Sequence, residues 1–479
     1  MSLDRETRVV AVVVIAGVIM SILDVTIVNV ALEALARDLR APLGTIQWVA
    51  TGYLLSLAMV IPLSGWASER FGAKPVWMCS VALFGACSAL CGLSWSAASL
   101  ICFRVLQGLG GGMILPVEMS LLAQTAGPQR VGRVMSVVGV PMLLGPVLGP
   151  VIGGLLVDGA SWRWIFFVNV PISVVAVILA ARLLPRAAGR ADPGRLDWLG
   201  VALLPPALAA IVFGLSETQS HGGIARPLAF GPVVLGLLLT CLFVLHARRA
   251  PRPLIDLRLF RSRRFSAAAA TAWMLGGALF GAMIILPLYY QVARGESALT
   301  AGLLMAPQGL GAALAMPFSG RLTDRVGGGP VALVGCVIMA LATLPLVLVD
   351  ATTPHAELAA VLVARGVGLG AAMMPAMAAA YAALTPAEVP RATSALNALQ
   401  RIGGSMGTAL LAVVLQHETR ATDAAASAFG RTFAWAAAIT LAAVVPAAVL
   451  AFAERPGRRR SRAAIAGASS ATRTRPASS

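Results

Sequence analysis

Long apolar segments alternate with short polar ones along almost the whole chain. Fourteen of these segments are long enough to form a membrane-spanning helix, which needs about 20 apolar residues. Their predicted bounds are 9–31, 46–66, 75–95, 98–122, 134–157, 164–184, 197–215, 228–246, 266–290, 300–320, 330–349, 357–379, 395–415 and 432–452. The pattern predicts an all-α polytopic membrane protein, and an even number of spans places both termini on one side.

The composition agrees with this prediction and excludes several classes of protein. Of the 479 residues, 58% are hydrophobic and 12% are charged, whereas a soluble domain has about 25% charged residues. A nucleic-acid-binding protein, a disordered protein and a disulfide-stapled secreted domain are therefore excluded. The six cysteines lie inside apolar segments and not at metal-ligand spacing. We expect no metal, no cofactor and no ATP site, and the lack of a clustered catalytic set argues against an enzyme.

The positively charged residues predict the orientation. If the N-terminus is cytoplasmic, 27 of the 37 Lys and Arg residues lie in cytoplasmic segments, 7 lie outside and 3 lie within spans. This excess predicts that both termini are cytoplasmic. The arginine-rich tail 454–479 is expected to be disordered and to rest on anionic lipid. With 36 arginines, one lysine and abundant alanine, the composition is typical of a GC-rich bacterial genome.

Two sequence motifs occur twice in the chain. The loop "GWASERFGAKP", Gly65–Pro75, corresponds to "GRLTDRVGGGP", Gly320–Pro330. The segment "RVLQGLGGGMILP", Arg104–Pro116, corresponds to "RGVGLGAAMMP", Arg365–Pro375. Two copies of a six-helix unit facing each other across a cavity form a transporter architecture.

The repeat predicts four regions. They are an N-terminal six-helix bundle (1–190), two inserted helices with a cytoplasmic loop (191–264), a C-terminal six-helix bundle (265–453) and the tail (454–479).

Five sequence motifs occur in the same order as in a known protein family. They are "LDVTIVNVAL" (Leu23–Leu32), the loop Gly65–Lys74, the stretch with Arg104, Gln107 and Gly108, "GPVLGPVIGG" (Gly145–Gly154) and "WRWIFFVNVP" (Trp162–Pro171). With these strings the chain resembles the fourteen-spanner drug:proton antiporters of the major facilitator superfamily along nearly its whole length. The resemblance implies the major facilitator fold and proton-driven export. The chain departs from the family pattern at Glu33, Glu69 and Ala73, where the family usually has proline, aspartate and a basic residue.

Three charged residues inside spans are candidates for proton coupling. Asp24 lies about 10 Å and Arg104 roughly 9 Å below the outer ends of their spans, so we expect them to pair. The alternative for Asp24 is that it only joins neighbouring helices. The alternative for Arg104 is that its side chain only extends its charge towards the outer surface. Glu118 lies about 21 Å along the helix from Arg104. It is interpreted as a second proton site or a counter-ion for a cationic substrate, with loop capping as the alternative.

Three further sets of residues are candidate sites. The conformational lock implied by the resemblance pairs Glu69 with Arg70, and a solvated charge pair is the alternative. This lock comprises Gly65, Glu69, Arg70, Gly72, Asp324 and Arg325. The antiporter helix comprises Gly145, Pro146, Gly149, Pro150, Gly153 and Gly154; we expect it to pack against the other half, with ordinary packing as the alternative. The substrate cavity is expected to include Asn29, Gln107, Gln308 and Asn397, unless these residues only join helices.

The sequence thus predicts proton-coupled efflux of amphipathic organic compounds, drugs or antibiotics, across a bacterial cytoplasmic membrane by alternating access. The alternative is a proton-coupled symporter that imports a metabolite, because a fold alone does not determine function. The expected partners are a small amphipathic organic substrate, protons and the lipid bilayer, without nucleic acid, and the chain is expected to be a monomer.

Overall fold

The computed structural model describes residues 5–126, 132–135, 139, 145, 149, 152–157, 159–184, 195–221, 227–385, 387–421 and 425–471. Within these residues, every regular element is a helix. The helices of the first part of the chain are α1 (Arg5–Asp38), α2 (Leu43–Val60), α3 (Leu63–Phe71), α4 (Ala73–Gly92), α5 (Ala97–Ala126), α7 (Trp164–Phe167), α8 (Asn169–Leu183), α9 (Trp198–His221) and α10 (Pro227–Arg249). Those of the second part are η1 (Leu257–Arg261), α11 (Arg263–Leu288), η2 (Tyr289–Ala293), α12 (Ala298–Leu304), α13 (Ala306–Val326), α14 (Gly328–Thr343), η3 (Leu344–Leu348), α15 (His355–Tyr381), α16 (Val389–Ala421) and α17 (Ala425–Ala471).

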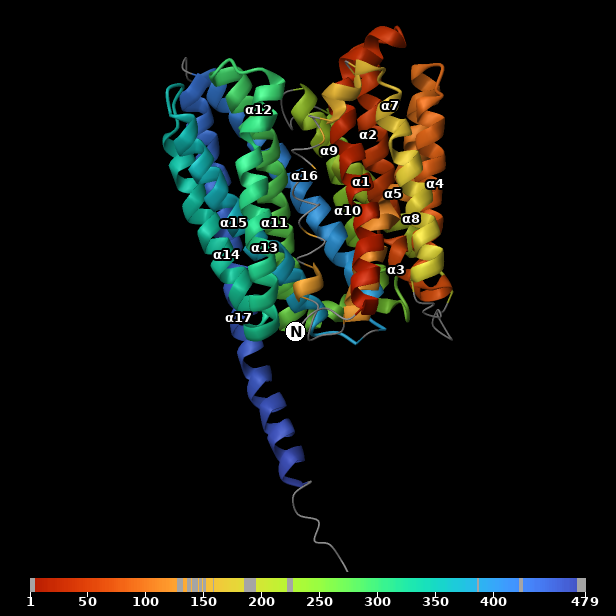
Figure 1. The fold of residues 1–479 in the computed structure, drawn as a ribbon, viewed down its shortest axis with the longest axis vertical. Coiled ribbons are helices and arrows are strands. Elements are labelled where there is room, and N and C mark those ends of the chain that lie inside the picture. Colours follow the sequence, from red (N-terminus) through yellow and green to blue (C-terminus); the bar gives the residue numbers. More distant parts are fainter. Residues whose placement is uncertain are drawn as a thin grey trace, which may run out of the picture.

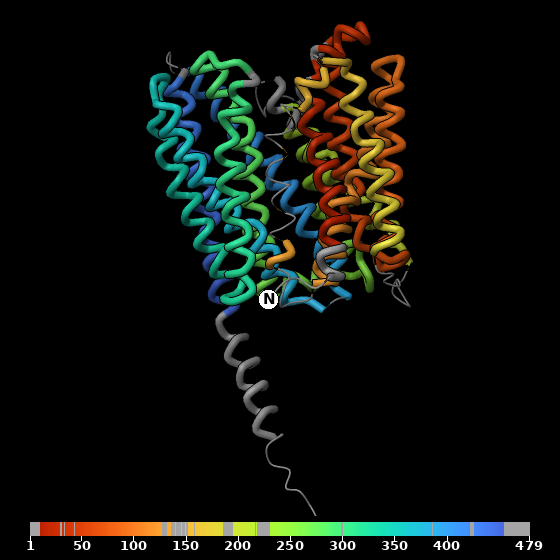
Figure 2. Tube along the Cα trace, in the orientation of Figure 1, coloured from red at the N-terminus to blue at the C-terminus, as the bar shows by residue number. Residues whose placement is uncertain are grey.

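The helices form two bundles that stand side by side (Figure 1). One bundle contains α1–α5, α7 and α8, and the other contains α11–α15 and α17. Helix α16 runs obliquely between them, as its trace shows (Figure 2), and it contacts α3 and α5 of the first bundle as well as α11 of the second. Helix α9 contacts both α2 and α16, so the inserted helices also bridge the two bundles.

The described residues support the predicted spans in part. Twelve of their helices are long and apolar enough to cross a membrane, and the bent pair α2 and α3 makes a thirteenth if it is counted as one span. The bend of 55° falls at Pro62, whose ring and missing N–H interrupt helical hydrogen bonding. The fifth predicted span, 134–157, lies mostly outside the described residues, so the count of fourteen stays a prediction.

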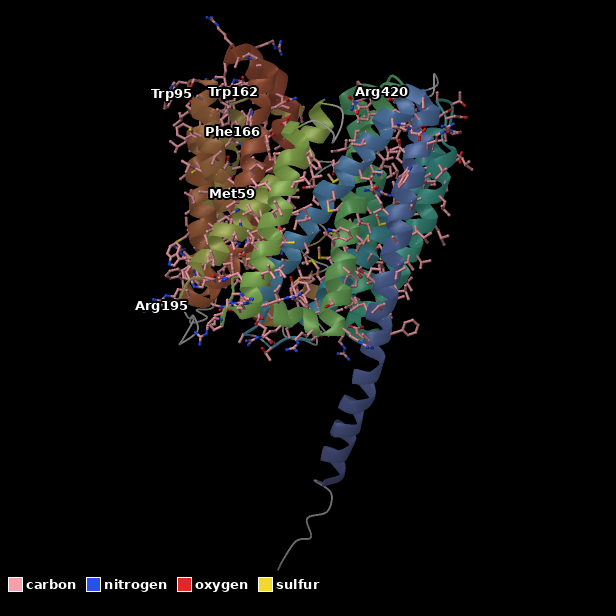
Figure 3. The ribbon with its side chains drawn as sticks, turned by 180° about the vertical axis from the view of Figure 1, so that it is seen from behind. Met59, Trp95, Trp162, Phe166, Arg195 and Arg420 are labelled. Carbon is pink, nitrogen blue, oxygen red and sulfur yellow. The ribbon has the colours of Figure 1, made fainter. Side chains whose placement is uncertain are left out.

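The first and last described helices begin and leave on the same side of the bundles. Helix α1 begins, and α17 leaves, at the end that also carries α3 (Figure 1). We call this end, which holds the repeated motifs 65–75 and 320–330, the motif end. Trp95, Trp162 and Arg420 lie at the opposite end, and Arg195 lies at the motif end (Figure 3). This placement follows the alternation of loops in the predicted topology.

The C-terminal segment differs from expectation. Helix α17 continues to Ala471, whereas the sequence predicted a disordered tail from residue 454. Alanine and arginine have high intrinsic helix propensity, so the helix that leaves the last span can continue through them. Residues 472–479 lie outside the described part of the chain.

The repeated loop takes the same conformation in both bundles. Gly72 has φ 86° and ψ 146°, and Gly327 has φ 98° and ψ 158°. Both lie between the end of one helix and the start of the next, in a backbone region that favours glycine. The repeat seen in the sequence is therefore a structural repeat at this turn.

Candidate functional site

Asp24 and Arg104 form a buried ion pair inside the first bundle. Nη1 of Arg104 on α5 lies 2.6 Å from Oδ2 of Asp24 on α1. Each residue is only 1% exposed. The pairing expected from their similar depths is thus present. An ion pair removed from water is stable only where further hydrogen bonds satisfy both groups.

Two amide side chains provide these hydrogen bonds to the carboxylate. Nε2 of Gln107 donates to Oδ1 of Asp24 over 3.0 Å, and Nδ2 of Asn169 donates to the same oxygen over 3.1 Å. Oε1 of Gln107 in turn accepts from Arg104 over 2.9 Å. Asn169 begins α8 and is also held by Ser88. Asn169 was not predicted from the sequence, although a polar side chain in the largely apolar string 162–171 could have indicated it.

The arginine is enclosed on its other sides. Its Nε donates to the backbone carbonyl of Val49 over 3.1 Å. The guanidinium carbon lies 4.0 Å from the ring centroid of Tyr53 and 5.6 Å from that of Phe166. The cation is thus stacked between aromatic faces. Asp24 and Arg104 are thus closed off from solvent by the residues that bind them.

Glu118 lies elsewhere in the same bundle, further along α5. It is fully buried, and its Oε2 accepts from Nε1 of Trp77 on α4 over 3.4 Å. Among the described residues its Oε1 has no hydrogen-bond partner. A Cβ atom placed on Gly17 of α1 would lie 3.2 Å from Oε2. Glu118 is therefore enclosed by helices α1, α4 and α5, where its described contacts are with helices and not with a loop.

The second bundle contains a matching arginine with different partners. Arg365 on α15 is 1% exposed and donates to Oε1 of Gln308, to Oγ1 of Thr343 and to the backbone carbonyl of Ala278. Ala278 lies on α11, the first helix of its bundle, as Asp24 lies on α1. In the described residues, Arg365 thus has neutral acceptors where Arg104 has a carboxylate.

The polar residues proposed for the cavity have separate positions. Gln107 belongs to the Asp24 network, and Gln308 binds Arg365. Asn397 is 3% exposed and donates to the carbonyl of Thr393 in its own helix. The side chain of Asn29 lies outside the described residues.

Arg401 was not proposed from the sequence and lies on α16 between the bundles. It is partly exposed, and its guanidinium carbon is 5.8 Å from the ring centroid of Phe280.

The repeated motif connects the two bundles at the motif end. Oε1 of Glu69 on α3 lies 2.9 Å from Nε of Arg391 on α16. Arg70, expected to be the partner of Glu69, is exposed instead. That expectation was wrong because neighbouring residues of a helix point in different directions.

The repeat supplies a second connection with the roles exchanged. Asp324, in the second copy of the motif, lies 3.7 Å from Arg133 of the first bundle. Ser64 and Ser394 share a hydrogen bond of 2.7 Å across the same boundary. Gly65 allows this close approach, since a Cβ there would lie 3.0 Å from the Cα atom of Arg391. Arg325 is exposed.

The glycines of the predicted antiporter helix face α1. Cβ atoms on Gly145, Gly149 and Gly153 would meet Ile22, Thr26 and Ile27 of α1, whereas one on Gly154 would meet no atom within 4 Å. The contacts of these three glycines therefore lie within the first bundle, and packing of this helix against the other half stays a prediction. Side-chain spacing of four selects one helix face, but it cannot tell which neighbour that face meets. Pro146 and Pro150 lie outside the described residues.

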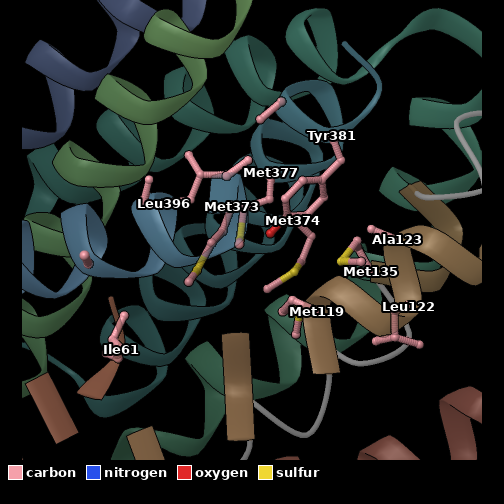
Figure 4. Close-up of a cluster of buried hydrophobic side chains, with 14 of the residues drawn as sticks. Ile61, Met119, Leu122, Ala123, Met135, Met373, Met374, Met377, Tyr381 and Leu396 are labelled. Carbon is pink, nitrogen blue, oxygen red and sulfur yellow. The ribbon is translucent and has the colours of Figure 1, made fainter. Parts of the chain in front are cut away.

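A methionine-rich cluster joins the bundles near the motif end (Figure 4). Met119 and Met135 come from the first bundle, and Met373, Met374 and Met377 come from α15 of the second. A Cβ on Gly139 would also meet Met316 and Met374, so the segment before the glycine repeat does contact the second bundle. Methionine side chains are flexible and adapt to irregular gaps in a core.

The family follows from comparison with known proteins. The family described as "Major Facilitator Superfamily" matches residues 14–408 and 300–477 of the chain. The chain belongs to the major facilitator superfamily. It is accordingly a multi-pass membrane transporter of small organic compounds and not an enzyme.

Relatives within the superfamily carry resistance names. The chain is 41% identical over 424 residues to the multidrug resistance protein B homolog of Mycobacterium tuberculosis, covering 88% of this chain and 78% of the relative. It is 32% identical over 404 residues to the tetracenomycin C resistance and export protein of Streptomyces glaucescens, covering 84% and 74%.

A solved structure shows the same major facilitator fold. The proton:xylose symporter XylE superimposes with a TM-score of 0.63 at 13% identity, covering 90% of this chain and 94% of that one. At this identity the likeness concerns the fold alone.

Proposed function

We propose that the protein exports amphipathic organic compounds, drugs or antibiotics, in exchange for protons. It acts by alternating access, as a monomer in the bacterial cytoplasmic membrane with both termini in the cytoplasm. The observation that carries this proposal is the buried pair of Asp24 and Arg104, enclosed by Gln107, Asn169 and Tyr53. Intramembrane ionisable groups mark ion pathways by default. The names of the related resistance proteins support export over import.

The contacts of the pair provide a route from protonation to helix movement. A proton on Asp24 removes the charge that attracts Arg104. The guanidinium then retains Gln107 and the carbonyl of Val49 as acceptors. The three helices that meet at Asp24, namely α1, α5 and α8, lose their strongest common contact. Their packing can then change with the protonation state.

The motif end provides the conformational lock of the proposal. Glu69 with Arg391, Asp324 with Arg133, and the serine pair all connect opposite bundles at this end. The described conformation is therefore closed at the motif end, which in the proposed topology faces the cytoplasm. Opening a path to the cytoplasm requires all three contacts to separate. Glu118 is the second proposed proton carrier, about 21 Å along α5 from Arg104.

Purified protein in proteoliposomes tests the exchange reaction. A drug-susceptibility panel on cells with and without the protein first identifies a transported compound. Proteoliposomes loaded with that compound are then diluted into acidic or neutral buffer. Exchange predicts faster loss of the compound into acidic buffer and simultaneous acidification of the interior. Loss of compound that is slower in acidic buffer, or uptake together with protons, would establish symport and overturn the proposal.

A further inference from the structure

A basic pocket lies at the motif end of α10, away from the coupling site. It encloses about 710 Å³ between the last turns of α10 and the segment 250–261 that leads into α11. Its polar walls carry Arg248, Arg258 and Arg261, all three exposed and opposed by one carboxylate, that of Asp256. In the described part of the chain no ion pair engages these three arginines. The pocket therefore has a net positive charge and unused hydrogen-bond donors.

The floor of the pocket is apolar, and the helix that forms one wall also carries an exposed apolar stripe. Val244, Ala247, Leu257 and Phe260 line the pocket between the arginines. Above it, Leu235, Leu238, Leu242 and Leu245 on α10 are each 51–57% exposed. Their spacing of three and four residues places them on one face of the helix, and the exposed Arg248 and Arg249 follow Leu245 by three and four residues. Helices α9 and α10 lie on the side of the molecule seen in Figure 3.

This arrangement matches the chemistry of one class of ligand. A phosphate group needs a cluster of arginines, which bind its oxygens in bidentate fashion. Acyl chains need an exposed apolar stripe that begins at that cluster. A free phosphate ion would use the arginines and leave the leucine stripe without a function. An anionic phospholipid uses both, and basic pockets beside membrane helices are typical sites for such head groups.

We propose that this pocket binds the head group of an anionic phospholipid, with its acyl chains lying along the leucine stripe of α10. The site does not depend on the exchange reaction proposed above. It is nonetheless connected to the lock, because Nη1 of Arg391 donates to the carbonyl of Pro253 over 3.3 Å, and Pro253 lines the pocket. Arg391 is the residue that pairs with Glu69. A bound lipid steadies the segment that holds Arg391 and thereby favours the closed motif end.

Lipid binding is measured first on the full-length protein in detergent. Phosphatidylglycerol is titrated and the thermal unfolding midpoint is followed, with phosphatidylcholine as the neutral lipid and inorganic phosphate as the free anion. The variant Arg258→Gln/Arg261→Gln removes two charges from the pocket. The matched control Arg182→Gln/Arg321→Gln removes two exposed charges from the motif end outside the pocket. Both variants carry the same net charge, so a general electrostatic effect of the lipid changes them equally.

The expected result is stabilisation by phosphatidylglycerol alone, with apparent affinity about 30-fold weaker in the pocket variant and unchanged in the control. A factor of 30 corresponds to about 2 kcal/mol, or about 1 kcal/mol for each arginine. Equal weakening in both variants would show a diffuse surface effect and overturn the proposal. Equal stabilisation by inorganic phosphate would show a free-anion site and would overturn it as well.

The connection to the lock has its own measurement. Ser64 is 1% exposed and lies between the bundles, so a cysteine introduced there reacts with a thiol reagent only when the motif end opens. With the native cysteines replaced, Ser64→Cys should be labelled more slowly in vesicles containing phosphatidylglycerol than in pure phosphatidylcholine vesicles. The difference should disappear in the Arg258→Gln/Arg261→Gln background and persist in the control background. If the labelling rate is the same in both kinds of vesicle in every background, the connection between the lipid site and the lock is refuted, whatever the outcome of the transport assay.

Discussion

Replacing Asp24 by asparagine changes the coupling site by a single atom and its charge. In the structure, Oδ2 of Asp24 accepts from Arg104, and Oδ1 accepts from Gln107 and Asn169. An asparagine side chain keeps one acceptor oxygen for the two amides. Its NH₂ group then faces the guanidinium of Arg104, where two donors meet. The variant therefore loses the ion pair but retains most of the remaining network.

The structure sets the size of the effect on stability. Removing one partner of a buried ion pair costs about 3–5 kcal/mol. Arg104 keeps Gln107 and the Val49 carbonyl as acceptors. Moreover, Arg365 is equally buried in the same fold with an amide, a hydroxyl and a backbone carbonyl as its acceptors. We therefore expect a loss of stability at the lower limit, about 3 kcal/mol, with normal membrane insertion.

Transport should respond differently from stability. An amide cannot bind and release a proton, so Asp24→Asn should abolish export driven by a pH gradient, and Asp24→Glu should retain part of it. The double variant Asp24→Asn/Arg104→Gln removes the unpaired cation as well. It should recover most of the lost stability and none of the export, because replacing both partners of a buried pair by neutral groups is far less costly than replacing one.

The assay compares two readings on the same preparations. Thermal unfolding in detergent reports stability, and export per copy of inserted protein in inverted vesicles reports coupling. Continued export against a gradient by Asp24→Asn would refute the assignment, and Glu118 would be the next candidate. A double variant that is no more stable than Asp24→Asn would show that the ion pair does not hold the three helices together.

Two further predictions concern packing and topology. Gly149→Leu should lower export per inserted copy roughly tenfold, because its Cβ would overlap Thr26 and a bias of about 1.4 kcal/mol between two conformations changes their ratio tenfold. The control is Gly154→Leu, because a Cβ at Gly154 has no atom within 4 Å. Equal losses of export in the two variants would show that the glycine repeat serves ordinary packing. The topology is tested in a background with the six native cysteines replaced. Ala351→Cys should be labelled from outside intact cells by an impermeant thiol reagent, and Ala387→Cys should be labelled only after permeabilisation. The reverse pattern would contradict a cytoplasmic motif end.

Some of the candidate site could be predicted from the sequence because charges inside apolar segments are costly. Asp24 and Arg104 stood out for this reason, and the rise of 1.5 Å per residue placed them at similar depths. The structure joins them at 2.6 Å. The repeated loop was likewise visible, since the backbone at Gly72 and Gly327 requires residues that tolerate positive φ.

Other contacts depended on how the helices are arranged in space. The sequence predicted Arg70 as the partner of Glu69, but the structure pairs Glu69 with Arg391, 322 positions later in the chain and in the other half of the molecule. Asn169 reaches Asp24 only because α8 packs beside α1.

The sequence by itself therefore determined the membrane-spanning helices, the internal repeat and the buried charges, since each follows from local hydrophobicity or from the cost of a charge in lipid. Only the tertiary structure decided which side chains meet. Helical periodicity specifies the face on which a residue lies, whereas its partner depends on which helix covers that face. For the same reason the glycines of the fifth predicted span were found at the correct spacing, but their contact with α1 became apparent only in the folded molecule.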